Sequence, residues 1–276
     1  MSIRANSAQW PSKRFPISDV AEMGVRLASF IIPVLLILAW QICSILGIFH
    51  PAALPSPLKV WLAFLNIIRN GTLAVDFGTS LFRVLHGFLW GISFGLLIGI
   101  LSGLSRFVER LVGPVVDAVR QIPTFAWIPL IVLWFGIGEL SKTVIISKAV
   151  FIPIFVNTLQ GIRSVPHEYV EVARILELSR WKFLRKVVIP AALPAIFTGI
   201  RLGAGFAWMA VVAAEMLGGL TGLGFALLKA KDFFQTDELI ALMFVIGLIG
   251  LVVDRSLKWL ESVTLRWRKS FAGNGR

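Results

Sequence analysis

The 276-residue chain is short of cysteine, histidine and charge, and each shortage excludes a class of protein. Its one cysteine, Cys43, leaves no internal disulfide and no cysteine-rich metal site. The histidines, His50, His86 and His167, are scattered, and His167-Glu168 lacks the second histidine of the zinc motif H-E-x-x-H. No Gly-Lys dipeptide occurs, which excludes the phosphate-binding loop of P-loop ATPases. We therefore expect no enzyme activity, metal or cofactor in this chain.

Charged residues make up 15% of the chain and hydrophobic residues 57%, whereas soluble domains carry about 25% charged residues. Apolar runs of about 20 residues predict an all-α membrane protein with six transmembrane helices. We expect the first run to be a retained membrane anchor. The expected spans lie at about 27–48, 80–104, 112–136, 143–162, 194–217 and 238–254.

Most lysines and arginines lie in residues 1–26, 163–190 and 255–276, with two more between the second and third spans. By the positive-inside rule these segments are cytoplasmic, which predicts a multi-pass plasma-membrane protein with both termini inside. The net charge of +12 is thereby explained by orientation, and no nucleic-acid partner is expected. Residues 51–71 predict an amphipathic helix on the outer surface, and the C-terminal RSLKWLESVTLRWRKS predicts an interfacial anchor.

Two patterns mark the second and third spans. Glycine recurs every fourth residue in the second, which lets another helix backbone approach closely, either as static packing or as a crossing that slides. Both alternatives place this span at the centre of the bundle. Prolines interrupt the third span and Pro153 the fourth, as kinks for packing or as walls of a transport pathway. The residues are Gly87, Gly91, Gly95, Gly99 and Gly103, then Pro114, Pro123 and Pro129.

The stretch GISFG, residues 91–95, matches the G-x-S-x-G motif of hydrolases. The motif requires a turn between a strand and a helix, with a base nearby, and here it lies inside a predicted helix. An intramembrane hydrolase using Ser93 is therefore the weakest of the functional alternatives.

Residues 163–190 form a charged loop between the fourth and fifth spans. We expect Ser164 to cap a helix there, and a second helix to run from Trp181 to Val188 and end at Pro190 and Pro194. A short amphipathic helix is marginal in water, so its apolar face needs a partner groove or the inner leaflet. The apolar face holds Tyr169, Val172, Ala173 and Leu176, and the charged face holds Glu168, Glu171, Arg174 and Glu177.

Glu171-Val172-Ala173, followed by Pro190, resembles the E-A-A-x3-G-x9-I-x-L-P loop of importer-type ABC transporter permeases. Other segments resemble the branch that includes aliphatic-sulfonate, taurine and nitrate permeases: LPSP (54–57), IPTFAWIPLIVLWFGIGELSK (122–142), IPAALPAIFTGIRLG (189–203), VAAEM (212–216) and GLG (222–224). Two positions depart from the pattern. Val172 replaces alanine, and Glu177 replaces the glycine that gives the usual left-handed helix stop, although Ser179 can still cap the next helix.

The resemblance implies the permease subunit of an ABC importer, most similar to aliphatic-sulfonate permeases. A taurine, nitrate or other small-anion importer is the alternative within this class, and a gradient-driven carrier is the alternative outside it. The implied partners are a second copy of the chain, a cytoplasmic ATPase dimer that uses ATP, and a periplasmic or lipid-anchored substrate-binding protein. The ATPase would contact Glu168, Tyr169, Glu171, Val172, Ala173, Arg174, Leu176 and Glu177.

Ionisable residues inside a membrane are costly and mark candidate functional positions. Lys148 could attract an anionic sulfonate or extend towards the interface. Arg83 and His86 could form an anion-attracting mouth or anchor their helix, and Glu215 is expected to pair with a cation. The full set of pathway candidates is Arg83, His86, Arg120, Gln121, Lys148 and Glu215.

Overall fold

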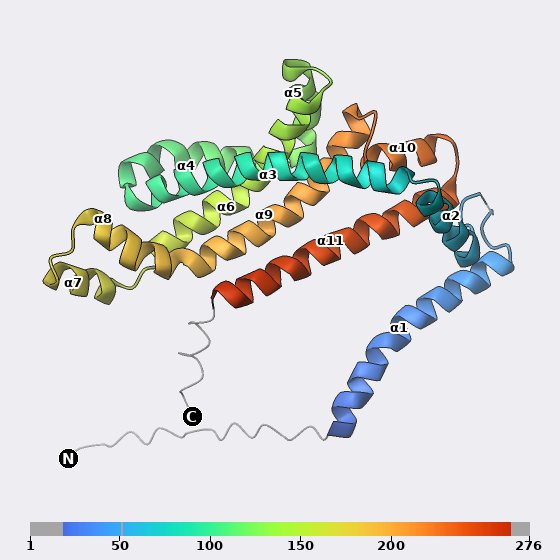
Figure 1. The fold of residues 1–276 in the computed structure, drawn as a ribbon, viewed down its shortest axis with the longest axis horizontal. Coiled ribbons are helices and arrows are strands. Elements are labelled where there is room, and N and C mark those ends of the chain that lie inside the picture. The colour runs from blue at the N-terminus through green and yellow to red at the C-terminus, as the bar shows by residue number, and fades with distance from the viewer. Residues whose placement is uncertain (1–18, 51, 266–276) are drawn as a thin grey trace, which may run out of the picture. The chain divides into compact units, whose positions relative to one another are not determined.

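The computed structural model describes residues 19–50 and 52–265, and every regular element in these ranges is helical (Figure 1). The chain divides into two units, residues 1–58 and 59–276. The elements are α1 (Asp19–Ile45), α2 (Pro57–Arg69), α3 (Thr72–Leu104), α4 (Arg106–Gln121), the 3-10 turn η1 (Thr124–Trp127), α5 (Ile128–Phe135), α6 (Glu139–Arg163), α7 (His167–Ile175), α8 (Arg180–Phe183), the π-helical turn η2 (Leu184–Val188), α9 (Ile189–Gly218), α10 (Leu223–Asp232) and α11 (Thr236–Thr264).

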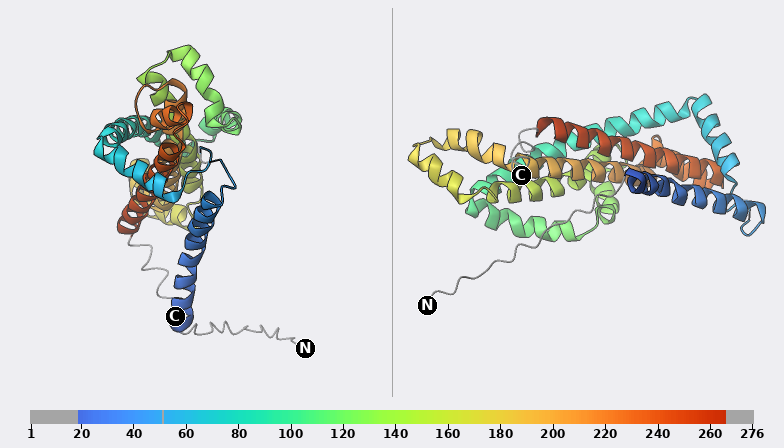
Figure 2. Two further views of the ribbon diagram at one scale, coloured as in Figure 1. Left: turned by 90° about the vertical axis from the view of Figure 1, so that its right-hand side faces the viewer. Right: turned by 90° about the horizontal axis from the view of Figure 1, so that it is seen from below.

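Four helices in the second unit are long and apolar enough to cross a membrane: α3, α6, the continuous helix Arg180–Gly218, and α11. They contain the spans predicted at 80–104, 143–162, 194–217 and 238–254, and they run roughly side by side (Figure 2). The bent pair of α4 and η1–α5 gives a fifth candidate. In the first unit the described apolar part of α1 is Ile31–Ile45, and Trp40 Nε1 donates a hydrogen bond to the Pro55 carbonyl at 3.0 Å.

The span predicted at 112–136 is not one straight helix, because the chain bends by 95° between α4 and η1–α5. Ile122 is extended, with φ −86° and ψ 118°, directly before Pro123. A proline disfavours helical geometry in the residue before it and supplies no N–H of its own, so the helix stops here. Pro114 and Pro153, in contrast, lie inside α4 and α6 without ending either helix.

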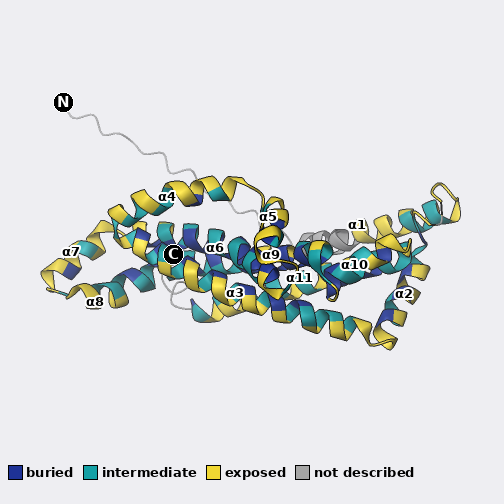
Figure 3. Cartoon of the chain, turned by 90° about the horizontal axis from the view of Figure 1, so that it is seen from above, coloured by how far each residue is buried: buried dark blue, intermediate teal, exposed yellow. Residues whose placement is uncertain are grey.

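The central helix of the bundle is α6, and the prediction that the glycine-rich span would be central is wrong. In the apolar core of each helix, 56% of the α6 residues are buried but only 22% of those of α3. The reason is that α6 packs against α3 on one side and α9 on the other. Only one stripe of α3 is buried, and most of the rest of its ribbon is intermediate or exposed (Figure 3). Leu89 and Leu97, for example, are exposed.

The buried stripe of α3 includes four of the five predicted glycines, and each of the five faces a β-branched residue of α6. A Cβ placed on Gly91 would lie 2.5 Å from the Cβ of Val150, closer than side chains pack. Both helices repeat every four residues, so the backbones stay in close contact along their whole crossing. The facing pairs are Gly87–Ile146, Gly91–Val150, Gly95–Ile154, Gly99–Thr158 and Gly103–Ile162.

The remaining predicted segments differ from the observed ones in their ends. α2 confirms the helix expected within 51–71, with Val60, Ala63 and Ile67 buried along one face. α11 continues past residue 254 to Thr264, where the Arg201–Glu261 ion pair (3.0 Å) ties it to α9. The tail predicted at 255–276 is therefore helical at its start, and residues 266–276 lie outside the described range. The N-terminal segment predicted at 1–26 is described only from Asp19, where α1 begins.

Candidate functional site

The helix expected in the charged loop is α7, which begins after Pro166 and not after a serine cap. Pro166 has φ −57° and ψ 140°, so its backbone leads into the helix from an extended geometry. Because proline has no backbone N–H, it leaves no donor without a partner at the start of the helix. The prediction that Ser164 caps this helix is wrong, because its hydroxyl donates to the Gly161 carbonyl at 3.0 Å. Ser164 instead ends α6.

One side of α7 packs on the protein and the rest is open. Ala173 is buried, whereas Tyr169, Val172 and Leu176 are 53%, 53% and 64% exposed. Ile175, which the sequence analysis did not single out, is 80% exposed. The charged side chains Glu168, Glu171, Arg174 and Glu177 are exposed as well. The described chain thus presents large apolar side chains beside carboxylates at one end of its bundle (Figure 1).

Glu177 keeps the left-handed helix stop that its replacement of glycine was expected to remove. Its φ is 48°, its N–H bonds the Arg174 carbonyl at 3.0 Å, and the Leu178 N–H bonds the Ala173 carbonyl at 3.0 Å. These two bonds are the Schellman ending of a helix, which glycine usually provides. The expectation that the stop is lost is therefore wrong, and a non-glycine residue bears the left-handed strain.

The second helix of the loop does not end at Pro190 as predicted. Ser179 caps it, confirming that expectation, by accepting a hydrogen bond from the Lys182 N–H at 3.4 Å. The helix then passes through the π-helical turn η2 into α9, and the continuous helix Arg180–Gly218 is 39 residues long. Pro190 and Pro194 both lie inside this continuous helix without ending it, Pro190 just after the π-helical turn. Val188 and Ala192 pack against Ile162 of α6, so α7 is joined to the bundle by a continuous, packed helix.

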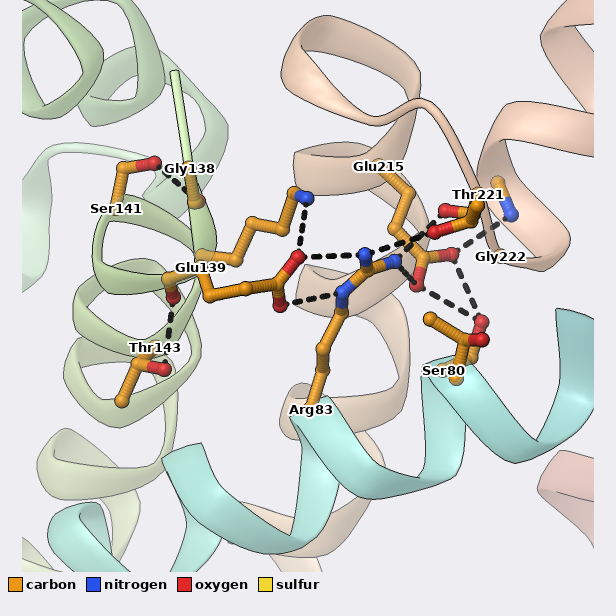
Figure 4. A network of polar contacts seen from close by, with 12 residues as sticks. Ser80, Arg83, Gly138, Glu139, Ser141, Thr143, Glu215, Thr221 and Gly222 are labelled. Atoms are coloured by element: carbon orange, nitrogen blue, oxygen red, sulfur yellow. Dashed lines mark hydrogen bonds and ion pairs between the residues drawn. The ribbon is translucent and has the colours of Figure 1, made fainter. Parts of the chain in front are cut away.

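An ionic network joins α3, α6 and α9 at the other end of these helices (Figure 4). Its Arg83 and Glu215 are buried, whereas the Glu139 side chain is 61% exposed. Arg83 is 5% exposed, and its Nε and Nη2 each donate a hydrogen bond to the Glu139 carboxylate at 2.7 Å. Its Nη1 donates to Glu215 at 2.8 Å and to the Thr221 carbonyl at 2.7 Å, and Nη2 also reaches the Thr221 hydroxyl at 3.1 Å. A guanidinium has five N–H donors, so these five contacts use all of them.

Glu215 is fully buried and holds the connection between α9 and α10 in place. It accepts hydrogen bonds from the Ser80 hydroxyl, Arg83 and the Gly224 N–H, each at 2.8–2.9 Å. Gly222, at φ 107°, adopts a backbone geometry that favours glycine, and its N–H bonds Asp76 at 2.9 Å. The expected pairing of Glu215 with a cation is thus present, and the geometry of Arg83 matches the anchoring alternative.

Lys142 completes the network by binding Glu139 at 2.9 Å, so two cations balance two carboxylates. His86 lies outside the network. Its side chain is exposed, the centroid of its ring lies 4.2 Å from that of Phe82 with the planes tilted by 49°, and Nδ1 lies 3.2 Å from the Phe82 carbonyl.

A cavity of about 350 Å³ brings together two other candidates, Arg120 and Lys148. It lies between the bend after α4, the middle of α6, and α9, and its walls include Ile145, Ile152 and Phe206. Lys148 Nζ lies 5.2 Å from the Trp127 ring and donates to the Ile122 carbonyl at 3.3 Å. Arg120 pairs with Asp117 on its own helix at 3.0 Å. Gln121 is exposed and does not line the cavity.

Residues 91–265 match the family described as binding-protein-dependent transport system inner membrane component. The chain belongs to this family. The permease is 37% identical to the Bacillus subtilis protein named as an aliphatic sulfonates transport permease, SsuC, over 90% of each chain. It is 36% identical to the nitrate import permease protein NrtB of Synechocystis, over 92% of this chain and 94% of the relative.

Solved transporters share the fold of this permease. A chain of an amino acid ABC transporter solved with histidines superposes with a TM-score of 0.55 at 19% identity, covering 74% of this chain and 97% of that one. The family and the named relatives, which are transport permeases, make this chain a transport subunit and not an enzyme. Ser93, the residue of the hydrolase alternative, donates its hydroxyl to the Leu89 carbonyl of its own helix at 2.7 Å.

Proposed function

We propose that this chain is the permease subunit of an ABC importer that moves aliphatic sulfonates into the cytoplasm. Two copies would form the pathway, an ATPase dimer would bind their α7 helices, and a separate binding protein would deliver the substrate to the outer side. The observation that carries this proposal is the exposed apolar face of α7, on a helix that the turn from Glu177 to Ser179 connects to the continuous helix Arg180–Gly218.

The contact with the ATPase is argued from the surface of α7. A helix of nine residues is marginal in water unless its apolar face is covered. Tyr169, Val172, Ile175 and Leu176 supply that face, and a hydrophobic groove in a partner is the matching surface. Glu171, exposed on the same helix, gives the contact a charge that selects its partner.

Movement of α7 would reach the membrane helices through two rigid joints. The Schellman ending at Glu177 and the cap at Ser179 fix the turn after α7. Arg180–Gly218 then acts as a single lever, because its first turns pack on α6 through Val188 and Ala192. Closing of two ATPase subunits would therefore tilt α9 and α6 together and not merely displace a loop.

The proposed orientation places α7 in the cytoplasm, along with both termini. The segment from Arg163 to Lys186 is rich in arginine and lysine, as cytoplasmic loops are. The network around Arg83, at the opposite end of α6, would then lie near the outer side.

The choice of substrate is argued from the named relatives. One is named for aliphatic sulfonates and the other for nitrate, and both solutes are small oxyanions with delocalised negative charge. We favour the sulfonate because the cavity that holds Lys148 has mostly apolar walls, whereas nitrate has no apolar part to contact them.

The coupling role is tested by truncating Leu176 to alanine and measuring binding of the purified ATPase to the permease in nanodiscs. A buried apolar anchor contributes about 2 kcal/mol to an interface, so the dissociation constant is expected to rise roughly thirtyfold. Leu220→Ala is the matched control, because Leu220 is 81% exposed on the α9–α10 connection. Equal affinities of the two variants would contradict the docking role of α7.

Glu171→Lys tests the charge on the same helix, with Asp232→Lys on α10 as its control. Uptake by the reconstituted transporter should fall for Glu171→Lys and persist for Asp232→Lys. The substrate is tested in the same proteoliposomes with labelled butanesulfonate, taurine and nitrate. Uptake of nitrate without butanesulfonate would overturn the sulfonate assignment and leave the importer assignment intact.

A further inference from the structure

The cavity beside Lys148 differs in charge from every other ionic site described in the bundle core. Arg83 uses all five of its donors and its network is neutral. Lys148, half-buried in the middle of α6, has three N–H donors, and its one described polar contact is the 3.3 Å bond to the Ile122 carbonyl. The described residues that line the cavity include no carboxylate, and Arg120 is already paired with Asp117 on its own helix. The net positive charge of the cavity therefore comes from Lys148.

The backbone around the cavity is also unusual. The 95° bend at Ile122 and Pro123 forms part of its wall, and irregular backbone at membrane depth is tolerated where it lines a cavity. Lys148 lies nine residues into α6, which is about 14 Å along the helix axis and close to the middle of a hydrocarbon core of about 30 Å. Transporter sites occur at this depth, beside interrupted helices.

A second polar group near the bend lacks a partner. The indole N–H of Trp127 is buried and has no hydrogen-bond acceptor in the described part of the chain. Its ring lies 5.2 Å from Lys148 Nζ. Trp127 is not among the residues that line the cavity, so it bears on the site through its ring, which lies beside the Lys148 ammonium at the cavity wall.

We propose that this cavity is a substrate site within the permease itself, where Lys148 and Arg120 bind the sulfonate group and the apolar walls bind its alkyl chain. The inference rests on the proposed function and adds selectivity to the membrane subunit. The volume of about 350 Å³ is at the small end of ligand pockets, which begin near ~300 Å³. Ile145, Ile152 and Phe206 offer the tail an apolar surface that neither nitrate nor the ammonium end of taurine can use.

Binding is measured as protection of an introduced cysteine from labelling by a maleimide. The method suits this chain because only one native cysteine has to be removed first. In a Cys43→Ala background that retains uptake, Thr124→Cys places a thiol on the cavity wall. The permease–ATPase complex is labelled with a maleimide, without the binding protein, in the presence of alkanesulfonates. Each added methylene from butane- to hexanesulfonate should strengthen protection about fourfold. Nitrate and taurine should protect weakly.

Charge is tested with Lys148→Met, which should weaken protection by hexanesulfonate at least about tenfold, because a hydrogen bond to a charged group is lost. Lys148→Arg should restore most of it. The matched control is Lys231→Met, which removes a lysine that is exposed on α10 and paired with Asp232. Equal protection in Lys148→Met and Lys231→Met would overturn the proposed site.

Two further comparisons complete the test. One asks whether another amphiphilic anion binds the cavity better than a sulfonate, and the other asks whether uptake and protection fail together or separately. Dihexanoylphosphatidylglycerol carries the same combination of anion and alkyl chain, and stronger protection by it than by hexanesulfonate would overturn the assignment in favour of a lipid site. Sulfonate uptake without any protection would overturn the site and leave the proposed function standing. Protection that depends on chain length and on Lys148, together with uptake of the same sulfonates, would support both.

Discussion

A single methyl group in the α3–α6 contact should separate two kinds of glycine in one helix. In Gly91→Ala the new Cβ would lie 2.5 Å from Val150 Cβ and 2.8 Å from the Ser147 carbonyl oxygen. The second contact is with backbone, so no change of rotamer can relieve it. Overpacking of this kind costs about 1–3 kcal/mol of the free energy of unfolding.

Gly78 is the matched control, because it lies in α3 and a Cβ there would meet nothing within 4 Å. Alanine is favoured over glycine inside a helix by about 1 kcal/mol. Gly78→Ala should therefore stabilise the permease slightly. Gly91→Ala gains the same propensity term, so the two variants should differ by the overpacking cost alone, about 1–3 kcal/mol, with Gly91→Ala the less stable.

The assay is thermal unfolding of the purified permease in nanodiscs, followed by tryptophan fluorescence, with uptake by the assembled transporter as a second readout. Tm should fall for Gly91→Ala and rise or stay constant for Gly78→Ala. If the two variants shift Tm alike, α3 and α6 are not in backbone contact and the reasoning fails. Val150→Gly should rescue Gly91→Ala only in part, because the Ser147 carbonyl remains in place.

Three further substitutions test separate features. Glu177→Gly should stabilise the end of α7 by about 1 kcal/mol, since the left-handed φ of 48° suits glycine, and amide exchange at Leu178 should slow; Glu171→Gly, inside the helix, should do the reverse. Ser179→Ala should remove the cap of α8 at a cost of about 1 kcal/mol, read as faster exchange at Lys182. Arg83→Met leaves the carboxylate of Glu215 buried without its cation, so Tm should fall by the equivalent of about 3–5 kcal/mol, and Glu215→Gln added to it should recover part.

Much of the fold could be predicted because its signals are local. Apolar runs mark α3, α6, α9 and α11, and a glycine every fourth residue marks a close helix contact whatever its partner is. The partner itself could not be predicted from that stripe. Its own signal is a β-branched residue at every fourth position from 146 to 162 in α6, and reading the two repeats together would have identified the pair and placed α6 at the centre.

The proline positions show where local signals become ambiguous. Pro114, Pro123 and Pro153 look alike in sequence, yet only Pro123 breaks its helix. A proline inside a transmembrane helix is accommodated when neighbouring groups satisfy the freed carbonyls, and that depends on tertiary packing. Glu177 is the converse case: hydrogen bonds from the chain that follows it hold a left-handed geometry that its residue type disfavours.

The candidate site shows why a list of charged residues in spans does not by itself identify a pathway. Arg83 and Lys148 are both cations inside predicted spans, and they differ in the groups that surround them. Those groups are distant in sequence: Thr221, whose carbonyl binds Arg83, lies 138 residues away. Arg83 has been neutralised by two carboxylates and its donors are filled, so it exerts little net attraction on an anion and serves to lock α3, α6 and α9 together. Lys148 has no carboxylate within ion-pair distance in the described chain, and an isolated charge is costly in an apolar environment. That cost falls when an anion arrives beside it, so the same desolvation that penalises the empty cavity favours its occupation by a sulfonate over an uncharged solute of equal size.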